Sequence, residues 1–140
     1  MGDWKTVRYD PAYPEPLDPE IIPLCDALNA AGFVTTTSCS GHGSACQWPH
    51  VWFEPSDDTR IERMVRFVKA TENFDYPPHT TVWQKEILLE GYAWSVEIHL
   101  WDGVDRDTPW QEALRKTGEA CKRVAQAIEA WHECELGEHL

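Results

Sequence analysis

The chain has 140 residues, a length typical of one domain with its own core, and 24 acidic residues against 12 Lys and Arg give it a net charge of −12. This excess of acidic residues disfavours sequence-independent binding to DNA or RNA, because such affinity comes mostly from basic side chains. No apolar run approaches the ~20 residues that span a bilayer, and the five cysteines form no close pair, which favours reduced thiols. We therefore expect a single cytoplasmic domain over residues 1–140, with no nucleic-acid or membrane partner and with oligomerisation left open.

The first part of the chain predicts a short strand and then a helix. The strand is expected over residues 5–9, and a proline-rich extended segment follows it. Asp18 is a suitable N-cap with Pro19 at the first helical position, and apolar residues at helical spacing continue to Gly32. The sequence therefore predicts a first helix that starts at Asp18 and stops at Gly32.

Four further strands are expected in two pairs. Residues 33–39 are rich in Thr and Val, and residues 51–54 form their expected partner. Residues 81–89 and 93–101 flank Gly91 and predict a hairpin. In its second strand apolar residues alternate with Ser95, Glu97 and His99, whose side of the sheet should be wet or contact a ligand.

Two more helices complete the predicted order. Residues 56–58 cap a helix that should end near Thr71, with four basic side chains pointing outward: Arg60, Arg63, Arg66 and Lys69. The last helix begins at a capping box around Pro109 and carries an apolar stripe to Trp131. These elements predict an α+β fold, a two-layer sandwich of three helices on an antiparallel or mixed sheet of about four to five strands.

The segment from Thr35 to Gly43 is the most informative for function, because a polar strand runs into glycines on both sides of His42. Glycines permit positive φ, so the backbone N–H groups of this loop can point at an anion. Nearby tryptophans can stack on a planar ligand, and an arginine of the second helix can pair with a phosphate. The predicted ligand-binding residues are Thr37, Ser38, Cys39, Ser40, Gly41, His42, Gly43, Trp48, Trp52 and Arg63.

Two other chemistries are compatible with the same segment. Cys39, His42, Cys46 and His50 are residue types that bind zinc, but their spacing matches no paired knuckle and the strand fixes the direction of Cys39. We therefore expect these four residues not to share a zinc ion. Cys39 and His42 could instead act as nucleophile and base, with the glycine N–H groups as oxyanion donors.

The run Phe33-Val34-Thr35-Thr36-Thr37-Ser38-Cys39-Ser40-Gly41 resembles the Ser-Cys-Ser-Gly strand and loop of the tRNA wybutosine-synthesising methyltransferase family. That family also places a helix before the motif, and the resemblance covers about residues 20–54. It implies a nucleoside or adenosyl ligand near Ser38, Cys39, Ser40 and Gly41, with S-adenosylmethionine as the cofactor.

From these features we predict a small-molecule-binding protein for a nucleotide- or nucleoside-like compound, for example a phage accessory factor that sequesters a signalling nucleotide. Its centre would be the loop from Ser38 to Gly43. Two alternatives stay open: a methyltransferase-like enzyme that uses S-adenosylmethionine, and an acidic protein-binding module or nucleic-acid mimic. Ser40→Ala and His42→Ala are expected to weaken ligand binding and to leave the fold intact.

Overall fold

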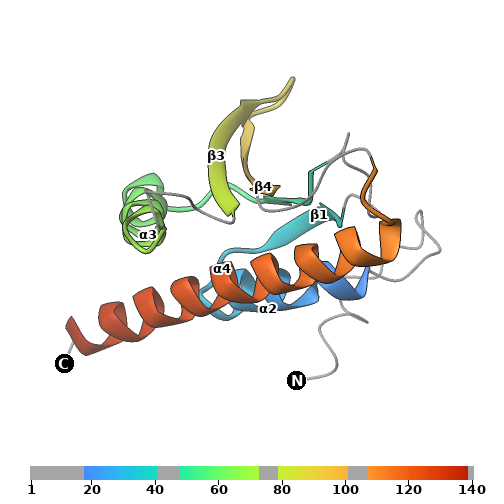
Figure 1. Cartoon of the computed structure of the whole chain (residues 1–140). Coiled ribbons are helices and arrows are strands. Elements are labelled where there is room, and N and C mark those ends of the chain that lie inside the picture. The colour runs from blue at the N-terminus through green and yellow to red at the C-terminus, as the bar shows by residue number, and fades with distance from the viewer. Residues whose placement is uncertain (1–17, 41–47, 73–78, 101–106, 139–140) are drawn as a thin grey trace.

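The computed structural model describes residues 18–40, 48–72, 79–100 and 107–138. Their elements, in chain order, are η1 (Pro19–Ile21), α2 (Ile22–Ala30), β1 (Thr35–Cys39), β2 (His50–Phe53), α3 (Asp58–Ala70), β3 (His79–Ile87), β4 (Tyr92–Leu100) and α4 (Trp110–Glu138). The strands form one antiparallel sheet in the order β1-β2-β4-β3, and α2 and α4 lie against one side of it (Figure 1). The predicted two-layer α+β sandwich is therefore confirmed. The strand expected over residues 5–9 lies outside the described residues.

The first helical segment is broken where a continuous helix was expected. A 3-10 turn, η1, precedes α2, in which Pro23 occupies the first turn. Asp18 occupies the N-cap position with Pro19 after it, as predicted, but its carboxylate makes no capping bond to this turn. It instead accepts hydrogen bonds from the backbone N–H and the hydroxyl of Ser40, at 3.1 and 2.9 Å. After α2, Gly32 takes a φ of +93°, a conformation that favours glycine and turns the chain toward β1.

The core fills the space between the helices and one side of the sheet. Ile21, Leu24 and Leu28 from the first helical segment are fully buried with Val51 and Phe53 of β2. Small residues are buried in the same core: Ala27, Ala31, Ala120 and Ala127. The amphipathic stripe predicted for the last helix is confirmed by its buried residues Cys121, Val124, Ile128 and Trp131. None of the described helices has the length and apolarity needed to cross a membrane.

Successive residues of β4 point to opposite sides of the sheet. Val96, Ile98 and Leu100 are buried on the helix side, as the alternation predicted. The cross-strand pairing places residues of all four strands on the other side, which carries no helix among residues the structure describes and is called here the helix-free face. They include Thr37, Cys39, His50, Trp52, Ser95, Glu97 and His99. Ser95 departs from the expected wet environment, since it is only 7% exposed and its hydroxyl donates to Glu86.

Helix α3 begins and ends where the sequence predicted. The carboxylate of Asp57 caps it by accepting from the N–H groups of Thr59 and Arg60, at 3.0 and 3.3 Å. The predicted outward direction of Arg60 is wrong. Its guanidinium lies 4.7 Å from the ring centre of Phe33, and its Nε donates to Glu135 at 2.7 Å. The reason is that α4 passes beside the start of α3 and offers this side chain a carboxylate.

Candidate functional site

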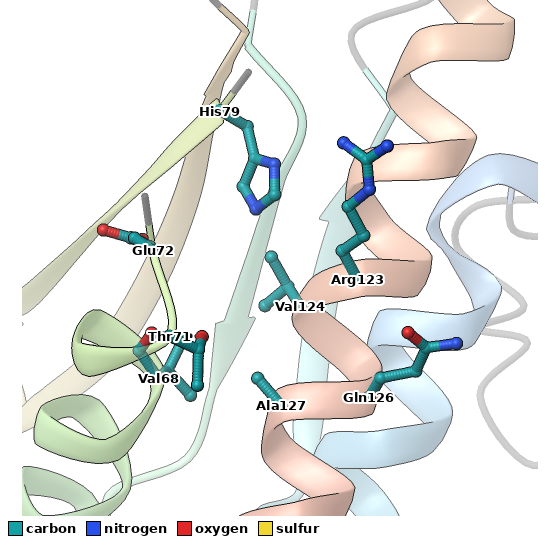
Figure 2. Close-up of a pocket in the computed structure, with 8 residues that line it drawn as sticks. All are labelled: Val68, Thr71, Glu72, His79, Arg123, Val124, Gln126 and Ala127. Carbon is teal, nitrogen blue, oxygen red and sulfur yellow. Dashed lines mark hydrogen bonds between the residues drawn. The ribbon is translucent and has the colours of Figure 1, made fainter. Parts of the chain in front are cut away.

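A cavity of about 520 Å³ lies between the end of α3, the start of β3 and the middle of α4 (Figure 2). Small-molecule sites commonly have volumes of roughly 300–1,000 Å³, so the cavity is large enough for a metabolite. Its apolar wall comes mainly from α4, and its polar groups come from all three elements. The lining residues are Val68, Thr71, Glu72, His79, Arg123, Val124, Gln126 and Ala127.

His79 is the first residue of β3, and its imidazole points into this cavity (Figure 2). Its Nδ1 atom is buried and has no hydrogen-bond partner among the described residues. Burial lowers the pKa of His79 below its usual value of 6.5; the Glu72 carboxylate opposes this shift, whereas Arg123 and Lys69 add to it. The ring is therefore neutral at neutral pH, with one nitrogen as donor and the other as acceptor.

Glu72 is fully engaged in holding the start of β3. Its carboxylate is 4% exposed and accepts from the N–H and the hydroxyl of Thr81, at 2.7 and 2.6 Å. The ammonium of Lys69 lies 2.7 Å from its second oxygen and also donates to the Thr81 carbonyl at 2.8 Å. This network ties the end of α3 to β3 two residues beyond His79. Glu72 thereby positions the imidazole, and its own acceptor atoms are occupied.

Arg123 faces His79 from α4 across the cavity (Figure 2). Within the described part of the chain it has no hydrogen-bond or ion-pair partner. A second hollow of about 180 Å³ adjoins the first and is lined by both residues together with Arg115 and Lys116. Arg115 is already bonded to Glu112 and Glu119. The guanidinium of Arg123 is therefore the cation that remains available to a ligand of the cavity.

Part of the sequence-predicted site gathers on the helix-free face. Thr37 and Cys39 of β1 are the register partners of Trp52 and His50. A shift in the register between Thr35 and Thr37 sets this alignment. Trp48 joins the group, because its ring stacks on His99 with a centroid distance of 5.0 Å and an interplanar angle of 19°.

Other predicted residues lie elsewhere. Ser38 points toward the helix side of the sheet, where its hydroxyl is buried and has no hydrogen-bond partner in the described ranges. Ser40 is 2% exposed, and its N–H and hydroxyl bind Asp18. Arg63 is exposed on α3, a helix on the far side of the sheet from Trp48 and Trp52, so the structure does not bring it to them.

The remaining predicted residues, Gly41, His42, Gly43 and Cys46, lie outside the described residues. Two members of the zinc set, Cys39 and His50, are register partners on neighbouring strands. Over the residues that are described, no group of three or more His, Cys, Asp or Glu could hold a metal ion. The expectation that the four residues do not share zinc stays a prediction.

Sequence reasoning missed both His79 and Arg123. His79 lay outside the predicted elements, before the strand expected over residues 81–89, and Arg123 was one charged residue between apolar positions of the last helix. The helical position next to buried Val124 was the available signal, but it gave no indication of which element Arg123 would face. Only the packing of α4 against the start of β3 brings the two residues together.

No protein-family model, no curated protein and no solved structure matches this chain. The resemblance to the tRNA wybutosine-synthesising methyltransferase family therefore stays a prediction. The geometry of the cavity is the basis on which a function can be proposed.

Proposed function

We propose that this protein binds a small anionic compound, with a phosphate or carboxylate group, in the cavity between His79 and Arg123. The observation that carries the proposal is that an unpartnered guanidinium and a buried, unpartnered imidazole nitrogen face each other across a cavity of metabolite size. Neither group has a hydrogen-bond or ion-pair partner among the described residues.

The two residues supply complementary contacts to such a ligand. The planar guanidinium of Arg123 can donate two parallel hydrogen bonds to a phosphate or carboxylate. The neutral ring of His79 can add one further donor or acceptor. A buried nitrogen without a partner destabilises a protein by about 1–3 kcal/mol, so a ligand that bonds to His79 recovers this free energy. Val124 and Ala127 can contact the apolar part of the compound.

The charge around the cavity favours an anion locally. The chain as a whole repels anions, with its net charge of −12, and Glu72 and Glu119 are among the residues that line the two adjoining hollows. Glu72 is bonded to Lys69 and Glu119 to Arg115, however, so Arg123 supplies the local positive charge. A nucleotide belongs to the proposed class, with its phosphate at Arg123. The nucleotide-like ligand expected from the sequence is thus retained, and its proposed place moves from the loop Ser38–Gly43 to this cavity.

Calorimetric titration with inorganic phosphate and adenosine monophosphate tests the proposal. Arg123→Gln should weaken binding of either probe by at least about tenfold, because it removes a charged hydrogen-bond partner. Lys122→Gln is the matched control, since it makes the same charge change on the preceding residue of α4, outside this cavity. Equal affinities in wild type, Arg123→Gln and Lys122→Gln would place the anion elsewhere. A protein that acts only through its acidic surface would bind neither probe.

A further inference from the structure

We propose that Cys39 and His50 form a nucleophilic thiol–imidazole pair on the helix-free face, which reacts with a low-molecular-weight disulfide. This site lies on the other side of the sheet from the His79 cavity and does not depend on the proposed function.

The two residues are neighbours across adjacent strands. Cys39 ends β1, His50 begins β2, and the two are antiparallel register partners. Residues directly opposite each other in an antiparallel pair have Cβ atoms about 4.5–5.5 Å apart, on the same face. Side-chain rotation can therefore bring the Cys39 thiol to the His50 imidazole, although no hydrogen bond joins the two in this structure. Both side chains are partly exposed, and Cys39 is not in a disulfide.

The hydrogen bond of the His50 ring decides which nitrogen is the base. Its Nδ1 lies 3.1 Å from the backbone carbonyl oxygen of Trp48. A carbonyl oxygen only accepts, so Nδ1 carries the hydrogen of the neutral ring and Nε2 carries the lone pair. No hydrogen-bond partner of Nε2 is found in the described ranges. Nε2 is therefore available to take the proton of the Cys39 thiol.

A carboxylate stands on the other side of His50. Glu97 of β4 is its register partner, so Cys39, His50 and Glu97 form one row across three strands of the helix-free face. Glu97 also lies 2.5 Å from Nε2 of His99, whose ring stacks on Trp48. These contacts fix Glu97 beside the imidazole. Its negative charge compensates the imidazolium cation that forms when His50 takes the proton.

The chemical step is thiol–disulfide exchange. The Cys39 proton moves to Nε2 of His50, and the thiolate sulfur attacks one sulfur of the disulfide. A new sulfur–sulfur bond forms on Cys39 and the original one breaks. The departing thiolate takes the proton back from His50, so the products are a mixed disulfide and a free small thiol, with no net change in oxidation state.

Site-resolved kinetics with dithiodipyridine, a neutral disulfide, tests this pair. The full-length protein is treated at neutral pH, quenched with acid and mapped by peptide mass spectrometry. Cys134 is the internal reference, because it is exposed on α4. Although Cys39 is less exposed, it should react at least about tenfold faster than Cys134, since the neighbouring imidazole can take up its proton as the sulfur attacks. Equal or slower reaction of Cys39 would overturn the proposal.

Two variants test whether the His50 imidazole is the base that activates Cys39. His50→Gln should lower the rate at Cys39 toward that of Cys134 and leave Cys134 unchanged. Gln84→Ala is the control on the same face and should leave both rates nearly unaltered, because Gln84 is exposed on β3 and is the register partner of Ser95, outside the row of Cys39, His50 and Glu97. A His50→Gln protein that keeps the fast rate at Cys39 contradicts the pair. Reaction of the buried Cys25 and Cys121 would show that a variant is unfolded. In that case the ratio of the Cys39 rate to the Cys134 rate in the wild-type protein decides whether the proposal holds.

Discussion

The carboxylate of Asp18 binds both the backbone N–H and the hydroxyl of Ser40, which joins the start of the first helical segment to the residue after β1. Two residues separated by 22 positions thus fix the chain where the polar loop begins. Ser40 is buried in this contact, so its hydroxyl serves the fold. The expectation that Ser40→Ala leaves the fold intact is replaced by a prediction about stability.

Ser40→Ala should lower the free energy of unfolding by about 1 kcal/mol, because one buried hydrogen bond is lost. Asp18→Ala should lower it by about 2–3 kcal/mol, since the buried N–H of Ser40 then also loses its acceptor. Chemical denaturation measures both. Glu20→Ala is the comparison for an acidic residue of the same segment whose side chain has no hydrogen bond or ion pair among the described residues, and a similar loss in all three variants would contradict a specific role of the Asp18–Ser40 contact.

The pair between Arg60 and Glu135 predicts a pH-dependent stability. Hydrogen bonding to the Arg60 guanidinium lowers the pKa of Glu135 below its usual value of 4.5. A carboxyl group whose pKa is lowered by folding stabilises the protein at pH values above its pKa in the unfolded state. This contribution disappears as the pH falls through its pKa in the folded state. Glu135→Gln should therefore be less stable than wild type at neutral pH, and the difference should shrink below pH 4.5. A difference that is constant with pH would contradict this role.

The order of helices and strands could be predicted because each segment carries its own periodicity and its own boundary residues. Asp57 caps α3 and Gly91 turns the hairpin, and both signals are local in sequence. Side-chain partners that are distant in sequence could not be predicted in the same way. Arg60 reaches Glu135 over 75 positions, so an amphipathic pattern alone placed it in solvent.

The candidate site was only partly predictable for the same reason. The sequence correctly placed Cys39 at the end of a strand beside a second strand. It could not show which side of the sheet Ser38 faces and which side Cys39 faces, because the register shift between Thr35 and Thr37 decides this. It also could not place His79 opposite Arg123, because their positions across the cavity depend on how α4 packs against the start of β3.

Glycine substitutions test the hairpin. Gly91 has a φ of +91°, and a Cβ atom there would meet nothing within 4 Å. Gly91→Ala should therefore destabilise the protein by about 1 kcal/mol through backbone strain alone. Gly137→Ala, in the last turn of α4 and also without a neighbour within 4 Å, should stabilise by up to about 1 kcal/mol. Thermal unfolding of the two variants should shift in opposite directions, and a shift of the same sign would refute this explanation.

The cavity predicts the titration of His79. Burial lowers the pKa of its imidazole, and the positive charge of Arg123 adds to this shift. Proton NMR should give a midpoint below 6.5 in wild type, and Arg123→Gln should raise it. A bound anion should also raise it, because a negative charge stabilises the imidazolium ion. A midpoint above 6.5, or one that Arg123→Gln leaves unchanged, would show that the two side chains do not share the cavity.

The most direct test of the proposed anion site is an NMR titration of the full-length protein with adenosine monophosphate. The Nε–H resonance of Arg123 and the ring resonances of His79 should shift together and saturate with one dissociation constant. The indole resonances of Trp48 and Trp52, on the helix-free face, should stay unchanged. Shifts confined to those two tryptophans, with Arg123 and His79 unaffected, would contradict the proposed site and return the ligand to the surface expected from the sequence.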